Sequence, residues 1–87
     1  MTVQERIAQK LGALNPESVE LSDDSAQHAG HEGARGGGGH YRVMIVAAAF
    51  RGISAQERHR MVYGALKEML PHEIHALSIQ AYAPEEI

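Results

Sequence analysis

Residues 40–82 read HYRVMIVAAAFRGISAQERHRMVYGALKEMLPHEIHALSIQAY, and the pattern of apolar residues in this stretch decides the fold. From His40 onward, Tyr41, Val43 and Ile45 alternate with the residues between them. Alternation with a period of two predicts a strand with one buried face. The stretch therefore begins with a strand.

The middle of the stretch carries the signals of a helix. Ser54 precedes Glu57 by three residues, which is the spacing of a capping box, and Gly52 and Pro71 break the chain on either side. One stripe recurs at helical spacing and consists of Arg58 through its aliphatic stem, Val62, Ala65, Leu66 and Met69. These features predict a helix that ends near Leu70.

The end of the stretch, residues 74–82, alternates again. The period places His75, Leu77, Ile79 and Ala81 on one face of a strand. A strand–helix–strand connection normally joins parallel neighbours in the right-handed sense. We therefore expect this last strand to lie parallel to the strand that begins near His40.

The residues before the stretch add a helix and a strand. Thr2 and Glu5 again have capping-box spacing, and apolar residues at helical spacing predict a helix over residues 3–14. A short strand follows around residues 19–22, and its simplest partner is the strand near His40, as a long-looped hairpin. The sequence thus predicts an α+β fold with the order α-β-β-α-β, in which a three-stranded mixed sheet is covered by helices on one face.

Residues 24–39 interrupt this pattern. The segment contains few apolar side chains and is rich in glycine and histidine, so it offers little to offset the entropy of ordering it. We expect a mobile loop here, within a single domain that spans residues 1–87. A short helical turn is expected after Ala83, because Pro84 suits the first position of a helix.

The composition excludes several classes of protein. The 87 residues include no cysteine, so the chain can form no disulfide and offer no thiolate to a metal. The longest apolar run, residues 43–50, is far shorter than the roughly 20 residues of a membrane-spanning helix. The N-terminal segment lacks a signal-peptide core. We therefore expect a cytoplasmic protein that does not enter a membrane.

Histidine supplies the side chains best suited to a transition metal. His28, His31 and His40 lie in or beside the glycine-rich segment, and His75 opens the last strand, so the four could offer imidazoles to one metal. A structural metal site usually needs four ligands at fixed spacing, which a flexible loop does not provide. The alternative interpretation is that the loop histidines are solvated.

Arg51, Arg58 and Arg60 form the one basic cluster, around the start of the second helix, as a nucleic-acid reader might have. Helix packing with a solvated guanidinium is the interpretation that we favour. The net charge of −3 argues against non-specific affinity for nucleic acid over the whole surface. No serine, histidine and acid stand in a recognisable catalytic motif, so we expect no enzyme activity.

Taken in order, several short motifs resemble those of the BolA family over almost the whole chain. They are Asp24-Ser25, His31, His40-Tyr41, Phe50-Arg51-Gly52, the run from Arg58 to Tyr63, and the run from His75 to Ile79. The chain departs from the family in its glycines before His40, in Tyr41 where phenylalanine is usual, and in Ile87 where many members have tryptophan.

The resemblance implies a type II KH-like fold and a monothiol glutaredoxin as partner. It also implies a two-iron two-sulfur cluster shared with that glutaredoxin and its glutathione, in iron-sulfur trafficking or iron-dependent regulation. The family's strand-start ligand falls on His75, and its loop ligand falls best on His31, with His28 as competitor. Some members are DNA-binding regulators, which makes DNA a possible second partner. We expect no cofactor in the isolated chain, and a monomer or weak homodimer.

Overall fold

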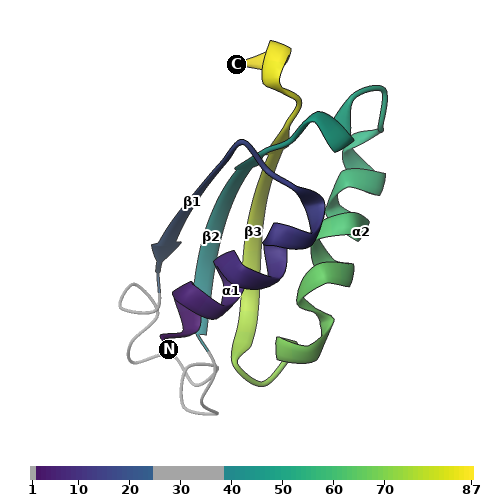
Figure 1. The fold of residues 1–87 in the computed structure, drawn as a ribbon. Coiled ribbons are helices and arrows are strands. Elements are labelled where there is room, and N and C mark those ends of the chain that lie inside the picture. Colours follow the sequence, from purple (N-terminus) through teal and green to yellow (C-terminus); the bar gives the residue numbers. More distant parts are fainter. Residues whose placement is uncertain (1, 25–38) are drawn as a thin grey trace.

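The computed structural model describes residues 2–24 and 39–87 (Figure 1). The principal elements are α1 (Val3–Leu11), β1 (Ser18–Asp23), β2 (Gly39–Val46), α2 (Ala55–Leu66) and β3 (Ile74–Tyr82). Short 3₁₀ turns follow α1, β2, α2 and β3, at Gly12–Leu14, Ala48–Phe50, Lys67–Met69 and Pro84–Glu86. The predicted order α-β-β-α-β and the turn after Ala83 are confirmed.

The strands form one mixed sheet in the order β1-β2-β3. β1 pairs with β2 in the antiparallel sense, with Val19 opposite Ile45. β3 pairs with β2 in the parallel sense, with Val43 opposite Ile79, as the crossover through α2 requires. The predicted topology and α+β class are therefore confirmed.

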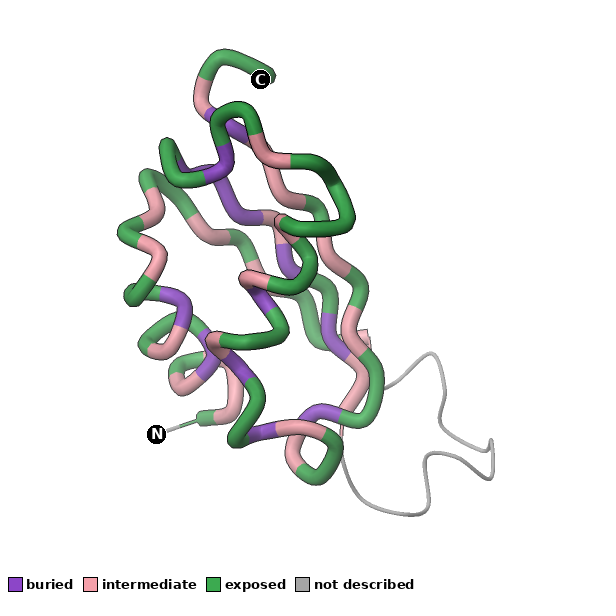
Figure 2. Tube along the Cα trace, turned by 90° about the vertical axis from the view of Figure 1, so that its right-hand side faces the viewer, coloured by how far each residue is buried: buried purple, intermediate pink, exposed green. Residues whose placement is uncertain are grey.

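Both helices lie on the same face of the sheet, and the core fills the space between them (Figures 1 and 2). Figure 2 shows buried residues on the helices and on the strands that face them. The largest fully buried side chains are Phe50, Ile7, Leu11, Ile45, Leu66, Met69, Ile74, Val43 and Val62. The opposite face of the sheet carries no helix among the described residues.

Side-chain caps start both helices where the sequence predicts them. The Thr2 hydroxyl accepts a hydrogen bond from the Glu5 amide at 3.1 Å, and the Glu5 carboxylate accepts one from the Thr2 amide at 2.9 Å. The Ser54 hydroxyl likewise accepts from the Glu57 amide at 3.2 Å. Each predicted helix ends in a 3₁₀ turn, since tighter hydrogen bonds commonly satisfy the last carbonyls of a helix.

The predicted alternation of β3 is wrong at its first residues. Ile74 lies opposite Gly39 and Ala76 lies opposite His40, so His75 is an extra residue in the pairing, a β-bulge. Ile74 consequently points into the core and is fully buried, whereas His75 is exposed. His75 therefore does not share the inner face with Leu77.

Most of the predicted loop lies outside the described residues, so the prediction that it is mobile stays a prediction. Its last residue, Gly39, already belongs to β2. Within residues 2–24 and 39–87, no helix has the length and apolar character needed to cross a membrane.

Candidate metal-ligand site

His75 lies at the end of the sheet where β2 and β3 begin. The bulge leaves this residue out of the regular pairing, and its side chain is exposed. Bulges often turn a side chain in a new direction beside a functional site. The structure therefore places His75 at the start of β3, as the sequence predicts, but outside the regular pairing.

The imidazole ring of His75 lies beside the imidazole ring of His40. The two ring centroids are 5.4 Å apart, and the ring planes are inclined at 53°. His40 follows the first residue of β2 and is half-buried, with its Nε2 atom shielded from solvent. The structure thus brings together two of the four histidines that the sequence suggests as ligands.

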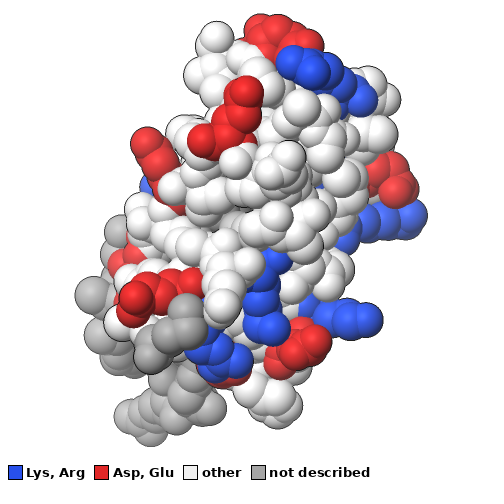
Figure 3. All heavy atoms as spheres, in the orientation of Figure 1, with Lys and Arg blue, Asp and Glu red and all other residues white. Residues whose placement is uncertain are grey.

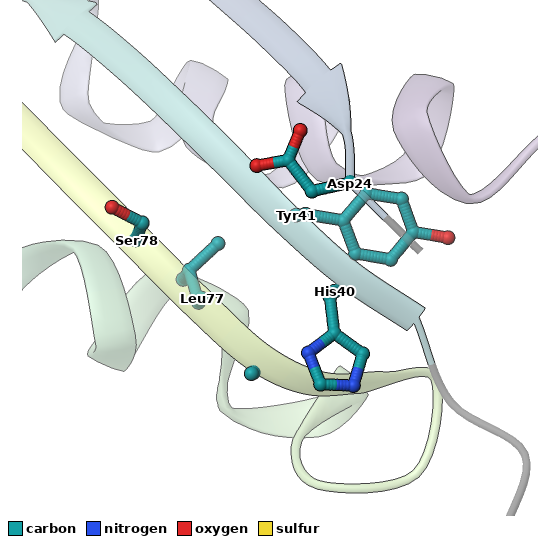
Figure 4. Close-up of a pocket in the computed structure, with 6 residues that line it drawn as sticks. Asp24, His40, Tyr41, Leu77 and Ser78 are labelled. Atoms are coloured by element: carbon teal, nitrogen blue, oxygen red, sulfur yellow. The ribbon is translucent and has the colours of Figure 1, made fainter. Parts of the chain in front are cut away.

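A shallow hollow of about 220 Å³ lies beside this histidine pair (Figure 4). Figure 4 shows the His40 ring extending toward β3, while Tyr41 leaves β2 on the other side. The residues that line the hollow are Asp24, His40, Tyr41, Ala76, Leu77 and Ser78. The hollow therefore joins the end of β1 to the beginnings of β2 and β3.

Tyr41 and Gly39 fix the backbone beneath the pair. A β-carbon added at Gly39 would lie 2.6 Å from Cζ of Tyr41, so the ring occupies the space that a side chain would need. Burial of the phenol raises the pKa of Tyr41, and the negative charges of Asp23 and Glu73 raise it further. Tyr41 is therefore a neutral, packed side chain at neutral pH.

Two hydrogen bonds and an ion pair hold the strand ends together. The Asp24 amide donates to the His40 carbonyl at 2.7 Å, and the Gly39 amide donates to the Glu73 carbonyl at 3.0 Å. The carboxylate of Asp24 also pairs with Arg42 at 3.2 Å. These contacts place the residues on either side of the 25–38 segment at the same end of the sheet as His75.

The other two candidate ligands, His28 and His31, lie outside the described residues. Sequence reasoning kept His40 only as one of four imidazoles, because alternation does not reveal the bulge that brings it beside His75. No group of three or more histidine, cysteine, aspartate or glutamate side chains is placed to hold a metal ion within residues 2–24 and 39–87. The described pair would need further ligands from elsewhere.

Arg58 lies at the opposite end of β3 and is held inside the domain. Its guanidinium donates to the carbonyls of Ile53 at 2.7 Å and Ala81 at 3.0 Å. It also donates to both carboxylate oxygens of Glu86, at 2.6 and 3.0 Å, and lies 5.9 Å from the centre of the Phe50 ring. The side chain is only 11% exposed. The expected packing of its stem agrees with this arrangement, but the expected solvated guanidinium is wrong.

The Arg58–Glu86 pair changes the ionisation of both side chains. Hydrogen bonds from Arg58 and from the Ala83 amide lower the pKa of Glu86 to about 2. The same carboxylate raises the pKa of Arg58. Glu86 is therefore ionised throughout the neutral range and balances the charge of Arg58.

The two remaining arginines of the basic cluster are exposed but also paired. Arg51 donates from Nε to both carboxylate oxygens of Glu85, at 2.9 and 2.7 Å, and Arg60 donates to Glu57 at 2.8 Å. On the face shown in Figure 3, basic side chains lie beside acidic ones instead of gathering in one patch. The cluster therefore has little excess positive charge in this structure.

Comparison with known proteins places the chain in a family. The family model described as BolA-like protein matches residues 11–86. SufE-like protein 1, chloroplastic/mitochondrial, of Arabidopsis thaliana is 43% identical over 94% of this chain and 24% of its own length. BolA-like protein 1 of Bos taurus is 45% identical over 85% of this chain and 53% of its own length. The chain thus spans about half or less of these two relatives.

Two further comparisons bear on fold and function. The solved BolA domain of SufE1 from Arabidopsis thaliana has a TM-score of 0.83 at 40% identity and covers 100% of this chain and 99% of that chain. It shares the type II KH-like α+β fold that the sequence resemblance implied. The DNA-binding transcriptional regulator BolA of Haemophilus influenzae is 34% identical over 99% of this chain and 82% of its own length. The chain therefore belongs to the BolA-like family, whose members are non-catalytic.

Proposed function

We propose that this domain partners a monothiol glutaredoxin and shares a two-iron two-sulfur cluster with it. The observation that carries the proposal is the exposure of His75, which a β-bulge places at the end of the sheet. In a chain without cysteine, imidazole is the reasonable ligand for iron, as in Rieske-type centres where two histidines replace two cysteines. The glutaredoxin and its glutathione supply the remaining thiolates.

The second ligand in this proposal is His31, with His28 as the alternative. Both lie outside the described residues, but Asp24 and Gly39, on either side of the segment, are hydrogen-bonded at the same end of the sheet as His75. His31 follows Asp24 by seven positions and precedes Gly39 by eight, so chain connectivity limits its distance from that end. Its ordering on cluster binding costs entropy, so we expect this ligand to contribute less than His75.

Such a cluster can be passed to client proteins or can report the supply of iron. The proposal therefore includes a role in iron-sulfur trafficking or iron-dependent regulation. We also propose that the free chain is one domain over residues 1–87, a monomer or weak homodimer, and cytoplasmic. Sedimentation of the purified chain tests the oligomeric state directly.

Co-expression with a monothiol glutaredoxin tests the cluster. The parent chain is expected to co-purify with its partner and to show the visible absorption of a two-iron two-sulfur cluster. His75→Ala should abolish that absorption, and His31→Ala should alter the spectrum while leaving some complex. The matched control is His59→Ala, because His59 is an exposed histidine on α2. If His75→Ala gives a complex with the parent spectrum, His75 is not a ligand.

A DNA-binding regulator is the second candidate, supported by the name of the Haemophilus influenzae relative. Arg51, Arg58 and Arg60 are the residues proposed for it, although Arg58 already donates four hydrogen bonds within the domain. Binding to duplex DNA through these residues should weaken steeply between 50 and 200 mM salt. An Arg51→Ala, Arg60→Ala double variant should then bind more weakly with a shallower salt dependence. Unchanged affinity in that variant rules out this surface.

A further inference from the structure

We propose that His40 and His75 form a two-imidazole site that binds one divalent transition-metal ion, such as Cu²⁺, Ni²⁺ or Zn²⁺, in the free domain. This site differs from the shared cluster, because it uses His40 and needs no glutaredoxin. It is tested with the metal ion and the chain alone. If the free chain binds no such ion, the glutaredoxin proposal still stands. If no cluster forms with a glutaredoxin, the two-imidazole site still stands.

The separation of the two rings suits a shared ion. Metal–nitrogen bonds to histidine are about 2.0–2.1 Å long, so two imidazoles bound to one ion at a near-tetrahedral angle have ring centroids about 5 Å apart. The centroids of His40 and His75 are 5.4 Å apart before any metal is bound. Their planes are inclined at 53° rather than stacked in parallel, which lets a nitrogen of each ring approach a common point.

The backbone that carries the two imidazoles is already ordered. His40 is paired with Ala76 in the parallel ladder between β2 and β3, and His75 is the bulged residue directly before that pair. The ring of Tyr41 packs over Gly39 and fixes the strand next to His40. Binding therefore orders only side chains, which costs far less entropy than closing a flexible loop.

The donor set determines which ions fit and how firmly they bind. Imidazole nitrogen suits copper, nickel and zinc, whereas magnesium and calcium prefer oxygen. Two protein ligands leave the remaining positions to water or to a partner, since the described residues place no third such ligand beside the pair. We expect an exchangeable ion rather than a structural one, and Cu²⁺ should bind more tightly than Ni²⁺ or Zn²⁺.

Calorimetric titration of the full chain with Ni²⁺ or Zn²⁺ measures the site. One ion should bind per chain, and His40→Gln and His75→Gln should each weaken the affinity at least tenfold. His59→Gln and His72→Gln are the controls, because both residues are exposed and lie outside the pair, and each should leave the affinity within threefold. A His28→Gln, His31→Gln double variant should also remain within threefold. Parent-like binding by His40→Gln, or loss of binding in the double variant, overturns the proposal.

Pulsed electron paramagnetic resonance of bound Cu²⁺ gives a second measurement that does not depend on the folding of a His40 variant. In the His28→Gln, His31→Gln background, the spectrum should show two equatorial imidazoles. Adding His72→Gln should leave that number at two. Fewer than two imidazoles in either chain means that His40 and His75 do not share an ion.

Discussion

The polar side chains at the two ends of β3 differ in how far they are engaged within the domain. At the end near Ala81, Arg58 donates to two backbone carbonyls and to the carboxylate of Glu86. At the other end, the exposed imidazole of His75 contacts the ring of His40. Figure 1 shows that α2 runs beside β3 between these ends. We call them the arginine end and the imidazole end.

This difference bears on which end is available to a partner. Charge-assisted, bidentate hydrogen bonds to a guanidinium are strong, and a ligand that used Arg58 would have to break several of them. The imidazole of His75 is exposed, and its ring contact with His40 is not a charge-assisted network that a metal ion would have to break. The arginine end therefore holds the C-terminal turn in place, whereas the imidazole end offers nitrogen ligands to a metal ion. This division favours metal chemistry over DNA binding as the function of the domain.

The largest expected effect lies in the core beneath both ends. Leu66 is fully buried on α2, so Leu66→Ala should destabilise the fold by about 2–5 kcal/mol. Chemical denaturation followed by circular dichroism measures the loss. Because both ends rest on this core, they should unfold in one transition. Two separate transitions, or a variant as stable as the parent, would contradict this packing.

A smaller effect is expected from Gly39→Ala at the imidazole end. The new β-carbon would meet the buried Tyr41 ring, and such overpacking typically costs about 1–3 kcal/mol. Gly64→Ala is the contrasting variant, since its β-carbon meets no atom within 4 Å and alanine favours a helix interior by about 0.5–1 kcal/mol. Gly39→Ala should lower the free energy of unfolding, and Gly64→Ala should raise it. Equal effects would show that Tyr41 does not fill this space.

At the arginine end, Arg58→Lys should lower the melting temperature more than Arg51→Lys. Lysine cannot reproduce the planar fork that reaches Ile53, Ala81 and Glu86 together. Arg51 makes one exposed pair with Glu85, which is typically worth about 1 kcal/mol or less. Thermal unfolding of the two variants under identical conditions provides the measurement. If both shifts are equal, the interior contacts of Arg58 contribute little.

The sequence predicted the fold well because its signals are local. Capping boxes at Thr2 and Ser54 and alternation in the strands depend on residues close together in the chain, and the elements form where these patterns stand. The mixed topology followed from the helix that connects β2 to β3. The predicted helices differ from the structure only at their last residues, which form 3₁₀ turns in place of α-helix.

The candidate site was less predictable because it depends on distant residues. The bulge at His75 arises because Ile74 pairs with Gly39 and Ala76 pairs with His40, residues 35 and 36 positions earlier, and nothing in the alternation of residues 74–82 signals it. Arg58 has its predicted place on the inner stripe, but its partner Glu86 lies 28 residues further along the chain. Tertiary packing sets proximity of this kind, so sequence spacing could name His75 and Arg58 but not the side chains that lie beside them.

The smallest expected effect is a local response of the C-terminal turn to acid. The pKa of Glu86 is lowered to about 2 in the folded chain from a usual value of 4.5. A carboxylate with a lowered pKa stabilises the folded state above its unfolded pKa and loses that contribution as pH falls through the folded value. The stabilising contribution of Glu86 should therefore be fully present above about pH 4.5 and should decline between pH 4.5 and 2.

NMR titration of the Glu86 side chain and of the Ala83 amide tests this response, because that amide donates to the Glu86 carboxylate at 2.7 Å. The Ala83 amide signal should shift as Glu86 gains a proton, with a midpoint far below 4.5. In Glu86→Gln the side chain cannot titrate, so this acid shift should disappear while signals of the imidazole end follow the parent. A Glu86 midpoint near 4.5 would mean that Arg58 does not hold this carboxylate in solution, and the contrast between the two ends would lose its basis.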